Sequence, residues 1–217
     1  MGEVWAIVVA GGSGSRFGNS TPKQFLDLGG LRVIDWALAA AGVVCDGVVA
    51  VLPSSHLHVT LPPGMTAVAG GGTRSESVRA GLAAIPGDAP VIVVHDAARP
   101  LADPALFGRV IAAVRDGADG AVPGISVPDT VKRVDASGQV IETLDRTALR
   151  AIQTPQAFAA EVLRGAHAAG GEATDDAALV EAAGGRVVVV EGDPGNLKVT
   201  GPDDLLQAET LLERRSL

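Results

Sequence analysis

The stretch VWAIVVAGGSGSRFG, residues 4–18, decides the fold class of this chain. Its first six residues are a continuous apolar run without polar alternation, and a glycine-rich loop follows directly. Runs of this kind are typical of strands buried on both faces of a parallel sheet. Since ligands in open α/β sheets bind at the carboxyl ends of such strands, the loop is a candidate binding site.

The rest of the chain repeats this pattern of short apolar runs and longer amphipathic segments. Strands are predicted at residues 4–9, 48–52, 66–69, 91–95, 120–125 and 187–191, and helices at 33–41, 74–85, 104–115, 158–169, 175–183 and 202–215. The pair Asp103-Pro104 is typical of a helix start, with a capping residue followed by proline in the first turn. Alternation of strands and helices predicts an α/β fold with a doubly wound, mostly parallel sheet.

The segment 126–157 interrupts that alternation. Residues 131–134 and 139–143 alternate polar with apolar side chains, and Asp-Ala-Ser-Gly separates them, which predicts a β-hairpin. Because a two-stranded hairpin is marginal by itself in water, we expect an arm that packs on another surface, most simply a second copy of the chain.

Composition restricts the class of protein. The length of 217 residues fits one domain, predicted to span 1–217, and the net charge of −8 argues against a nucleic-acid partner. Cys45 is the only cysteine, so neither an intramolecular disulfide nor a cysteine-built metal site is expected. Glu3 stands where a signal peptide carries positive charge, and the apolar runs are too short to span a membrane. We therefore expect a soluble, cytoplasmic protein without a membrane partner.

The glycine-rich loop fits some phosphate-binding templates better than others. Its glycines at 12, 14 and 18 are spaced one residue too far for a dinucleotide fingerprint, and the G-K-[ST] of a Walker loop is absent. Two alternatives remain, a plain strand–helix turn and a nucleotidyltransferase loop whose amides hold a triphosphate. Arg16 and Lys23, two cations beside the loop of an acidic protein, favour the second.

Other candidate site residues follow later strands. Asp96 ends a predicted buried strand, and since Asp103 already caps the next helix, we interpret Asp96 as a Mg²⁺ ligand. The stretch Gly70-Gly-Gly-Thr-Arg74 opens a helix, where anions or polar base edges bind, although capping alone is the alternative. Lys198 is either a ligand or a surface residue, His95 is expected to be packed rather than a base, and His56 and His58 to lie in a loop.

These motifs in this order resemble the 2-C-methyl-D-erythritol 4-phosphate cytidylyltransferase family. The resemblance rests on AGGSGSRF, PKQF, GGGTRSESV, VHDAARP, PDTVKR, TLDR, TPQAF, TDDA and NLKVT, which together cover residues 10–200. It implies a Rossmann-like sheet, a β-arm that clasps a partner in a homodimer, and CMP transfer from CTP to the methylerythritol phosphate with Mg²⁺. Ribitol-5-phosphate cytidylyltransferase, which shares most motifs, is the alternative, and a non-catalytic nucleotide-binding subunit is a more remote one.

The resemblance also implies roles for individual residues. Arg16, Lys23, Arg146 and Lys198 would be catalytic, and Asp96 would hold the metal. Nucleotide contacts would come from Ala10, Gly11, Gly12, Ser13, Gly14, Gly71, Ser77, Asp96 and Ala97. The acceptor phosphate would meet Arg99, Thr130, Arg146 and Thr154, of which Thr130 and Arg146 would reach into the neighbouring subunit. Val9 and Gly72 depart from the family pattern.

Overall fold

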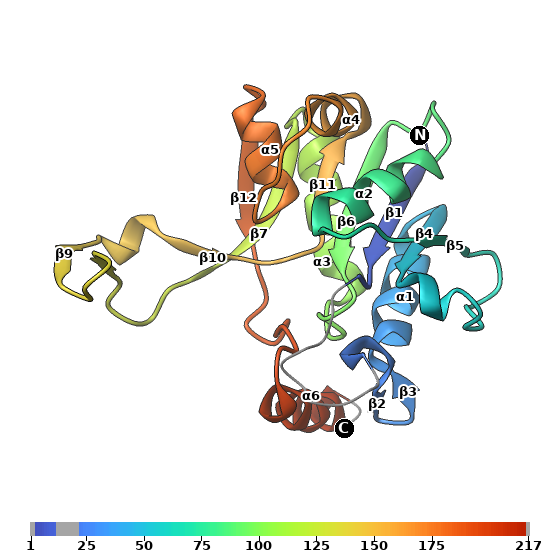
Figure 1. Cartoon of the computed structure of the whole chain (residues 1–217), viewed down its shortest axis with the longest axis horizontal. Helices are drawn as coiled ribbons and strands as arrows, with labels where there is room; N and C mark the ends of the chain where they lie inside the picture. Colours follow the sequence, from blue (N-terminus) through green and yellow to red (C-terminus); the bar gives the residue numbers. More distant parts are fainter. Residues whose placement is uncertain (1–2, 12–21, 216–217) are drawn as a thin grey trace.

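The computed structural model describes residues 3–11 and 22–215. A central eight-stranded sheet, flanked by helices on both faces, organises the chain (Figure 1). Its strands run in the order β12-β7-β11-β6-β1-β4-β5, and β10 pairs with β7 next to β11. The sheet strands are β1 (Val4–Val9), β4 (Gly47–Leu52), β5 (Thr66–Ala69), β6 (Val91–Asp96), β7 (Gly120–Ser126), β10 (Arg150–Ile152), β11 (Gln156–Ala159) and β12 (Val187–Glu191).

Burial explains why these residues form a parallel sheet. Strands β1 and β6 lie side by side in its centre, pairing from Val4 opposite Val91 to Val9 opposite Asp96, and both consist mainly of buried Val and Ile. β-Branched side chains suit a pleated surface covered on both faces. The predicted mostly parallel α/β sheet is therefore confirmed, with β10 and β11 as antiparallel members.

Helices cover the two faces through separate apolar clusters. One cluster joins the sheet to α1 (Val33–Val44) and α3 (Pro104–Arg115), and the other joins it to α2 (Arg74–Ala83), α4 (Ala160–Ala168) and α5 (Asp176–Ala182). A third cluster, built around Leu28, Val33 and Val199, packs α6 (Pro202–Arg215) against the small β2 (Asp27–Leu28)–β3 (Leu31–Arg32) hairpin. Asp103 caps α3 as predicted, since its carboxylate accepts from the amide of Leu106. Within the described ranges, no helix has the length and apolar character needed to cross a membrane.

The helix predicted at 158–169 starts too early. Phe158 belongs instead to β11, where it pairs with Ile92 of β6 and is fully buried. The mistake has a local cause, because β11 runs directly into α4 and its apolar residues extend the amphipathic pattern of the helix. Pairing between two strands that are distant in sequence overrides that local pattern.

Residues between β7 and β10 form an arm that projects from the body of the molecule (Figure 1). It holds the antiparallel pair β8 (Lys132–Val134) and β9 (Val140–Thr143), as the hairpin prediction required. The turn between them is closed by Asp135, whose carboxylate accepts from the amides of Ser137 and Gln139. The predicted arm of 126–157 is too long, because the chain is paired with β7 again from Arg150 onward.

Candidate active site

The site lies where β1, β4 and β6 end, at the edge of the sheet that the sequence indicates. The amide of Ala10 donates to the carbonyl of Val51 at 2.8 Å, and the amide of Ala97 donates to the carbonyl of Val9 at 3.0 Å. The Ala10 amide is therefore committed to the sheet, and the predicted nucleotide contact of Ala10 stays a prediction. Gly12, Ser13, Gly14 and Arg16 lie outside the described residues, so their predicted contacts stay predictions.

Lys23 lies at the start of a short 3-10 helix, Lys23–Phe25, that is fastened beside the end of β1. The buried Gln24 side chain donates to the carbonyl of Ala10 and so holds this helix in place. The Nζ atom of Lys23 donates to the carbonyl of Val199 at 2.7 Å. Lys23 and the residue next to Lys198 are thus in direct contact, although 176 positions separate them in the sequence.

A pocket of about 240 Å³ opens beside Asp96. It is lined by Arg74, Asp96, Arg99, Ile152, Gln153, Thr154, Gln156, Thr174, Asp175 and Lys198. The structure therefore brings together four residues predicted from three separate motifs, namely Asp96, Arg99, Thr154 and Lys198.

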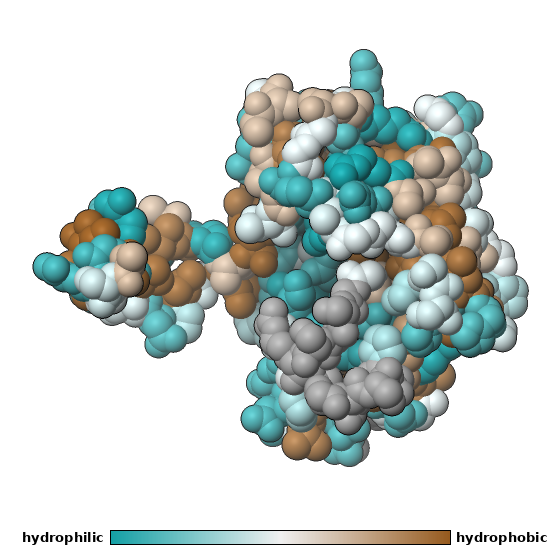
Figure 2. All heavy atoms as spheres, viewed as in Figure 1, coloured by the Kyte–Doolittle hydropathy of each residue, from teal (hydrophilic) through white to brown (hydrophobic). Residues whose placement is uncertain are grey.

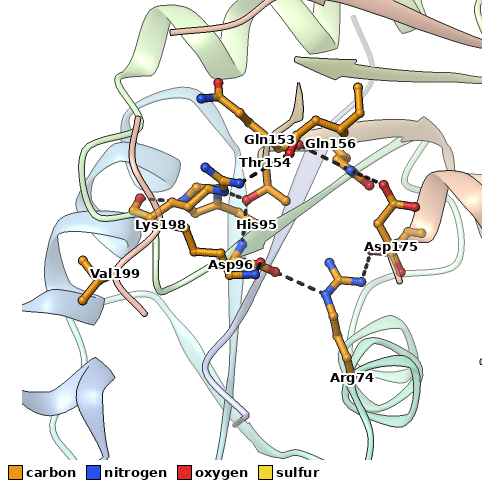
Figure 3. A network of polar contacts seen from close by, with 12 residues as sticks. Arg74, His95, Asp96, Gln153, Thr154, Gln156, Asp175, Lys198 and Val199 are labelled. Atoms are coloured by element: carbon orange, nitrogen blue, oxygen red, sulfur yellow. Dashed lines mark hydrogen bonds and ion pairs between the residues drawn. The ribbon is translucent and has the colours of Figure 1, made fainter. Parts of the chain in front are cut away.

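Asp96 is the electrostatic centre of this pocket (Figure 3). Its carboxylate accepts from Nζ of Lys198 at 2.7 Å and from Nε of Arg74 at 3.3 Å. Burial would raise the pKa of Asp96, but the charges of Arg74 and Lys198 outweigh that effect and hold its pKa well below its usual range. Asp96 therefore has two ion-pair partners within the chain, and its ionised carboxylate is a hard oxygen donor of the kind Mg²⁺ prefers.

A metal at this position would depend on one protein carboxylate. Among residues 3–11 and 22–215, no group of three or more His, Cys, Asp and Glu side chains is placed to hold an ion. This donor set fits Mg²⁺, which usually keeps several waters and takes substrate phosphate oxygens as further ligands.

Behind Asp96, a hydrogen-bonded chain fixes Thr154 and His95. The amide of Asp96 donates to Oγ1 of Thr154 at 3.0 Å, and that hydroxyl lies 3.1 Å from Nδ1 of His95. The other ring nitrogen lies 3.1 Å from the carbonyl of Arg99, so the network assigns a neutral ring that carries its proton on Nε2. Burial lowers the pKa of His95 to about 4. His95 is thus packed, as the sequence predicts, and its neutral ring is tilted by 56° against the ring of Phe107.

The loop that carries Lys198 is anchored by buried amide side chains. Asn196, fully buried, donates to the carbonyl of Thr154 at 2.9 Å, and Gln153 donates to the carbonyl of Asp193 at 2.8 Å. The Nη1 atom of Arg99 donates a hydrogen bond to the carbonyl of Asn196 at 2.7 Å. Arg99 therefore supports this loop and also lines the pocket. Sequence reasoning overlooked Gln153 and Asn196 as individual residues, although both belong to or adjoin quoted motifs, TPQAF and NLKVT.

A second pocket, of about 580 Å³, adjoins the first. It is lined by Gly11, Pro22, Pro53, Ser54, Ser55, Gly70, Gly71, Gly72, Thr73 and Arg74. Arg74 belongs to both linings and so separates the two pockets. A Cβ atom at Gly71 would lie 2.3 Å from Cβ of Glu76, so close packing against the first turn of α2 explains this glycine without a ligand.

Thr73 and Ser77 take part in the start of α2. Thr73 and Glu76 form a capping box, in which Oγ1 of Thr73 accepts from the amide of Glu76. Ser77 is 1% exposed, and its hydroxyl donates to the carbonyl of Thr73 at 2.9 Å, directly behind Gly11 and Gly70. Its predicted contact with the base stays a prediction, because Ser77 lies behind the wall of the second pocket rather than on it.

The two remaining predicted residues lie on the arm. Thr130 and Arg146 are exposed there, and Arg146 donates to the carbonyl of Pro128. Neither belongs to the lining of the Asp96 pocket of its own chain. His56 and His58 lie in the loop region after β4, where His56 stacks on Phe25.

An ionised carboxylate and lysines at the carboxyl edge of a parallel sheet, next to a pocket walled by glycines, define a nucleotidyltransferase of Rossmann-like fold. Comparison with known proteins agrees, since residues 4–214 match the family described as 2-C-methyl-D-erythritol 4-phosphate cytidylyltransferase. The chain belongs to this family.

Individual relatives support this assignment over the whole length. The protein of that name from Nocardia farcinica is 50% identical over 223 residues, covering 99% of this chain and 96% of the relative. The solved structure of the same enzyme from Thermus thermophilus is 37% identical with a TM-score of 0.81, covering 98% of this chain and 100% of the other. The 4-diphosphocytidyl-2C-methyl-D-erythritol synthase of Anaerococcus prevotii, at 28% identity, covers 98% and 99% with a TM-score of 0.85.

Proposed function

We propose that this chain transfers CMP from CTP to 2-C-methyl-D-erythritol 4-phosphate, in isoprenoid precursor synthesis, with Mg²⁺ bound at Asp96. The observation that carries the proposal is the Asp96–Lys198 ion pair at the end of β6, which adjoins the glycine-walled pocket and lies next to the Lys23–Val199 contact. Family membership favours the methylerythritol phosphate over ribitol phosphate as acceptor.

The reaction requires charge neutralisation more than acid–base chemistry. A phosphate oxygen of the acceptor attacks the α-phosphorus of CTP, a new P–O–P bond forms, and the bond to the β-phosphate breaks to release pyrophosphate. A phosphate monoester is already ionised at neutral pH, so it needs no strong general base. His95 fits this scheme, because both of its ring nitrogens are hydrogen-bonded and the low pKa keeps the ring neutral.

The lysines and arginines of the site would act through their positive charge at fixed positions around the phosphates. Lys23 and Lys198 would lie against the triphosphate, where preorganised positive charge stabilises the transition state. Arg16 would add to this charge. Mg²⁺, when bound to Asp96, would supply further positive charge to the phosphate oxygens. Arg99 and Thr154 would hold the acceptor phosphate from the neighbouring wall.

We also propose a homodimer formed through the arm. Val134, Val140 and Ile141 are 51%, 52% and 56% exposed on β8 and β9, and apolar residues gather on the arm in Figure 2. An isolated hairpin with this much exposed apolar surface gains stability by packing on a partner. Such an arrangement would bring Thr130 and Arg146 of one subunit to the pocket of the other, in a soluble, cytoplasmic enzyme.

A pyrophosphate-release assay tests the activity. We expect release with CTP and methylerythritol phosphate in the presence of Mg²⁺, loss of release with EDTA, and recovery when Mg²⁺ is added in excess. Ribitol 5-phosphate as the acceptor is the control. A higher kcat/KM with ribitol phosphate would contradict the proposed acceptor, and full turnover in EDTA would contradict the proposed metal.

A further inference from the structure

A line of alternating charges runs from the pocket into the interior and ends on a buried histidine. Lys198 contacts Asp96, Asp96 contacts Arg74, and Arg74 donates from Nη1 to Oδ2 of Asp176 at 2.8 Å. The other oxygen of Asp176 lies 2.9 Å from Nε2 of His167. These five residues come from the loop between β12 and α6, and from β6, α2, α5 and α4, so the line joins parts that are far apart in the sequence.

Asp176 anchors Arg74 from behind. The Asp176 side chain is 1% exposed and lies in the first turn of α5, whereas the Arg74 side chain is 23% exposed and begins α2. A guanidinium with a planar fork of donors can bridge two carboxylates in a fixed geometry, which a lysine cannot do. Arg74 therefore has little freedom to turn, and the carboxylate it contacts on the pocket side is held in one orientation.

The charge balance argues against Arg74 as a phosphate ligand. Asp96 and Asp176 already face its guanidinium, so the positive charge of Arg74 is neutralised before a substrate arrives. Burial lowers the pKa of Arg74, but the two carboxylates outweigh this effect and raise it, so the residue stays charged. Its charge acts on Asp96, whereas the 44% exposed Lys198 is accessible to a ligand.

We propose that Arg74 is a positioning residue, which Asp176 braces and which sets the orientation of the Asp96 carboxylate in the active site. Only the expected effect on turnover rests on the proposed function; the orientation of the Asp96 carboxylate does not. Arg74 acts through Asp96, so its contribution to turnover exists only while Asp96 carries a carboxylate.

A double-mutant cycle tests this dependence. Arg74→Gln is expected to lower kcat about tenfold in the wild-type background, and less than twofold when Asp96 is already Asn, because coupled residues give non-additive effects. The matched control is Arg79→Gln, which removes another α2 arginine whose ion pair with Glu172 is largely exposed. Its effect is expected to be below twofold in both backgrounds. An equal loss from Arg74→Gln in both backgrounds, or an equal rise of the KM for CTP in both, would overturn the proposal.

Removing Arg74 alone leaves Asp176 as a buried carboxylate without its cation, so the single variant is expected to be less stable. The double variant Arg74→Gln with Asp176→Asn removes both charges together and supplies a second test. We expect it to show the same kcat loss with a smaller drop in melting temperature. Wild-type kcat in this folded double variant would refute the positioning role.

A crystal structure of the same double variant separates this inference from the proposed function. We expect the Asp96 carboxylate to leave the orientation in which it faces both Arg74 and Lys198, whatever substrate the enzyme uses. An unchanged Asp96 rotamer would refute the inference. Absence of turnover by the wild-type protein with CTP and methylerythritol phosphate would instead refute the proposed function, and the crystallographic comparison would still decide the role of Arg74.

Discussion

The Nζ atom of Lys23 donates a 2.7 Å hydrogen bond to the backbone carbonyl of Val199. The contact ties the segment after the first strand to the loop that carries Lys198. Because Lys198 in turn contacts Asp96 at the end of β6, three separate segments converge on one group of charges.

Substitution of Lys23 tests whether this group of charges is needed for catalysis. Lys23→Ala is expected to lower kcat for pyrophosphate release by about 10²–10³-fold, since removal of one preorganised donor from such a site typically costs that much. Arg109→Ala is the control, because Arg109 is a cation on α3 that donates to the carbonyl of Glu191 at 3.1 Å and not to the loop that carries Lys198. Retention of most of the kcat by a folded Lys23→Ala protein would contradict a catalytic role.

If the arm forms the dimer, mixing two inactive variants should restore activity through subunit exchange. If Arg146 enters the partner's site, then Arg146→Ala and Lys23→Ala proteins are each inactive, but their mixed dimer contains one site with both side chains intact. Random exchange produces mixed dimers as half of the population, so activity should recover to about a quarter of the wild-type value. The assay is pyrophosphate release after mixing, compared with each variant alone.

Ile141→Asp supplies the control for this experiment. A charge in the exposed apolar part of the arm is expected to weaken the dimer, shift sedimentation toward the monomer, and prevent recovery on mixing. Absence of recovery despite a stable mixed dimer would show that Arg146 acts in its own subunit.

The close packing at Gly71 predicts a steric effect. Gly71→Ala would place a methyl group against Cβ of Glu76, and overpacking of this kind typically costs about 1–3 kcal/mol. The loop that walls the second pocket must shift, so we expect the KM for CTP to rise about tenfold, which corresponds to about 1.4 kcal/mol.

Gly72→Ala is the matched control for Gly71. Its nearest contact would be the carboxylate oxygen of Glu76 at 3.3 Å, at the end of a flexible side chain, and a smaller change in KM is expected. Equal KM values for wild type and Gly71→Ala in steady-state kinetics would show that this wall does not contact the nucleotide.

The low pKa of the buried His95 ring predicts how the stability of the fold depends on pH. Burial lowers its pKa from 6.5 to about 4, so between these pH values the unfolded chain binds a proton that the folded chain does not. The free energy of unfolding should therefore fall as pH decreases from about 6.5 to 4, by at most about 3 kcal/mol from this residue. Urea unfolding at pH 7 and pH 4.5 measures the change, and His95→Gln should reduce it. An NMR titration of the His95 ring with a midpoint near 6.5 would contradict the assignment.

Most of the sheet and several site residues follow from the sequence, because their signals are local. Strand β1 and helix α3 appear with the predicted bounds, since a continuous apolar run and an Asp-Pro cap are properties of neighbouring residues. The motifs around Asp96 and Lys198 likewise indicate charges at strand ends. Because β1, β4 and β6 run parallel, their carboxyl ends then lie at one edge of the sheet.

Contacts between segments that are far apart in the sequence are defined only in the folded chain. Strand β11 has no signal of its own and exists because β6 and β7 pair with it. The partners of Asp96 come from α2 and from the loop between β12 and α6, so no local pattern could predict that two cations neutralise it. The sequence alone shows which charged groups follow the apolar runs, because the runs and the residues after them are local features of the chain. Folding decided which charges meet, because the Coulomb energy depends on distance in space and not on separation along the chain.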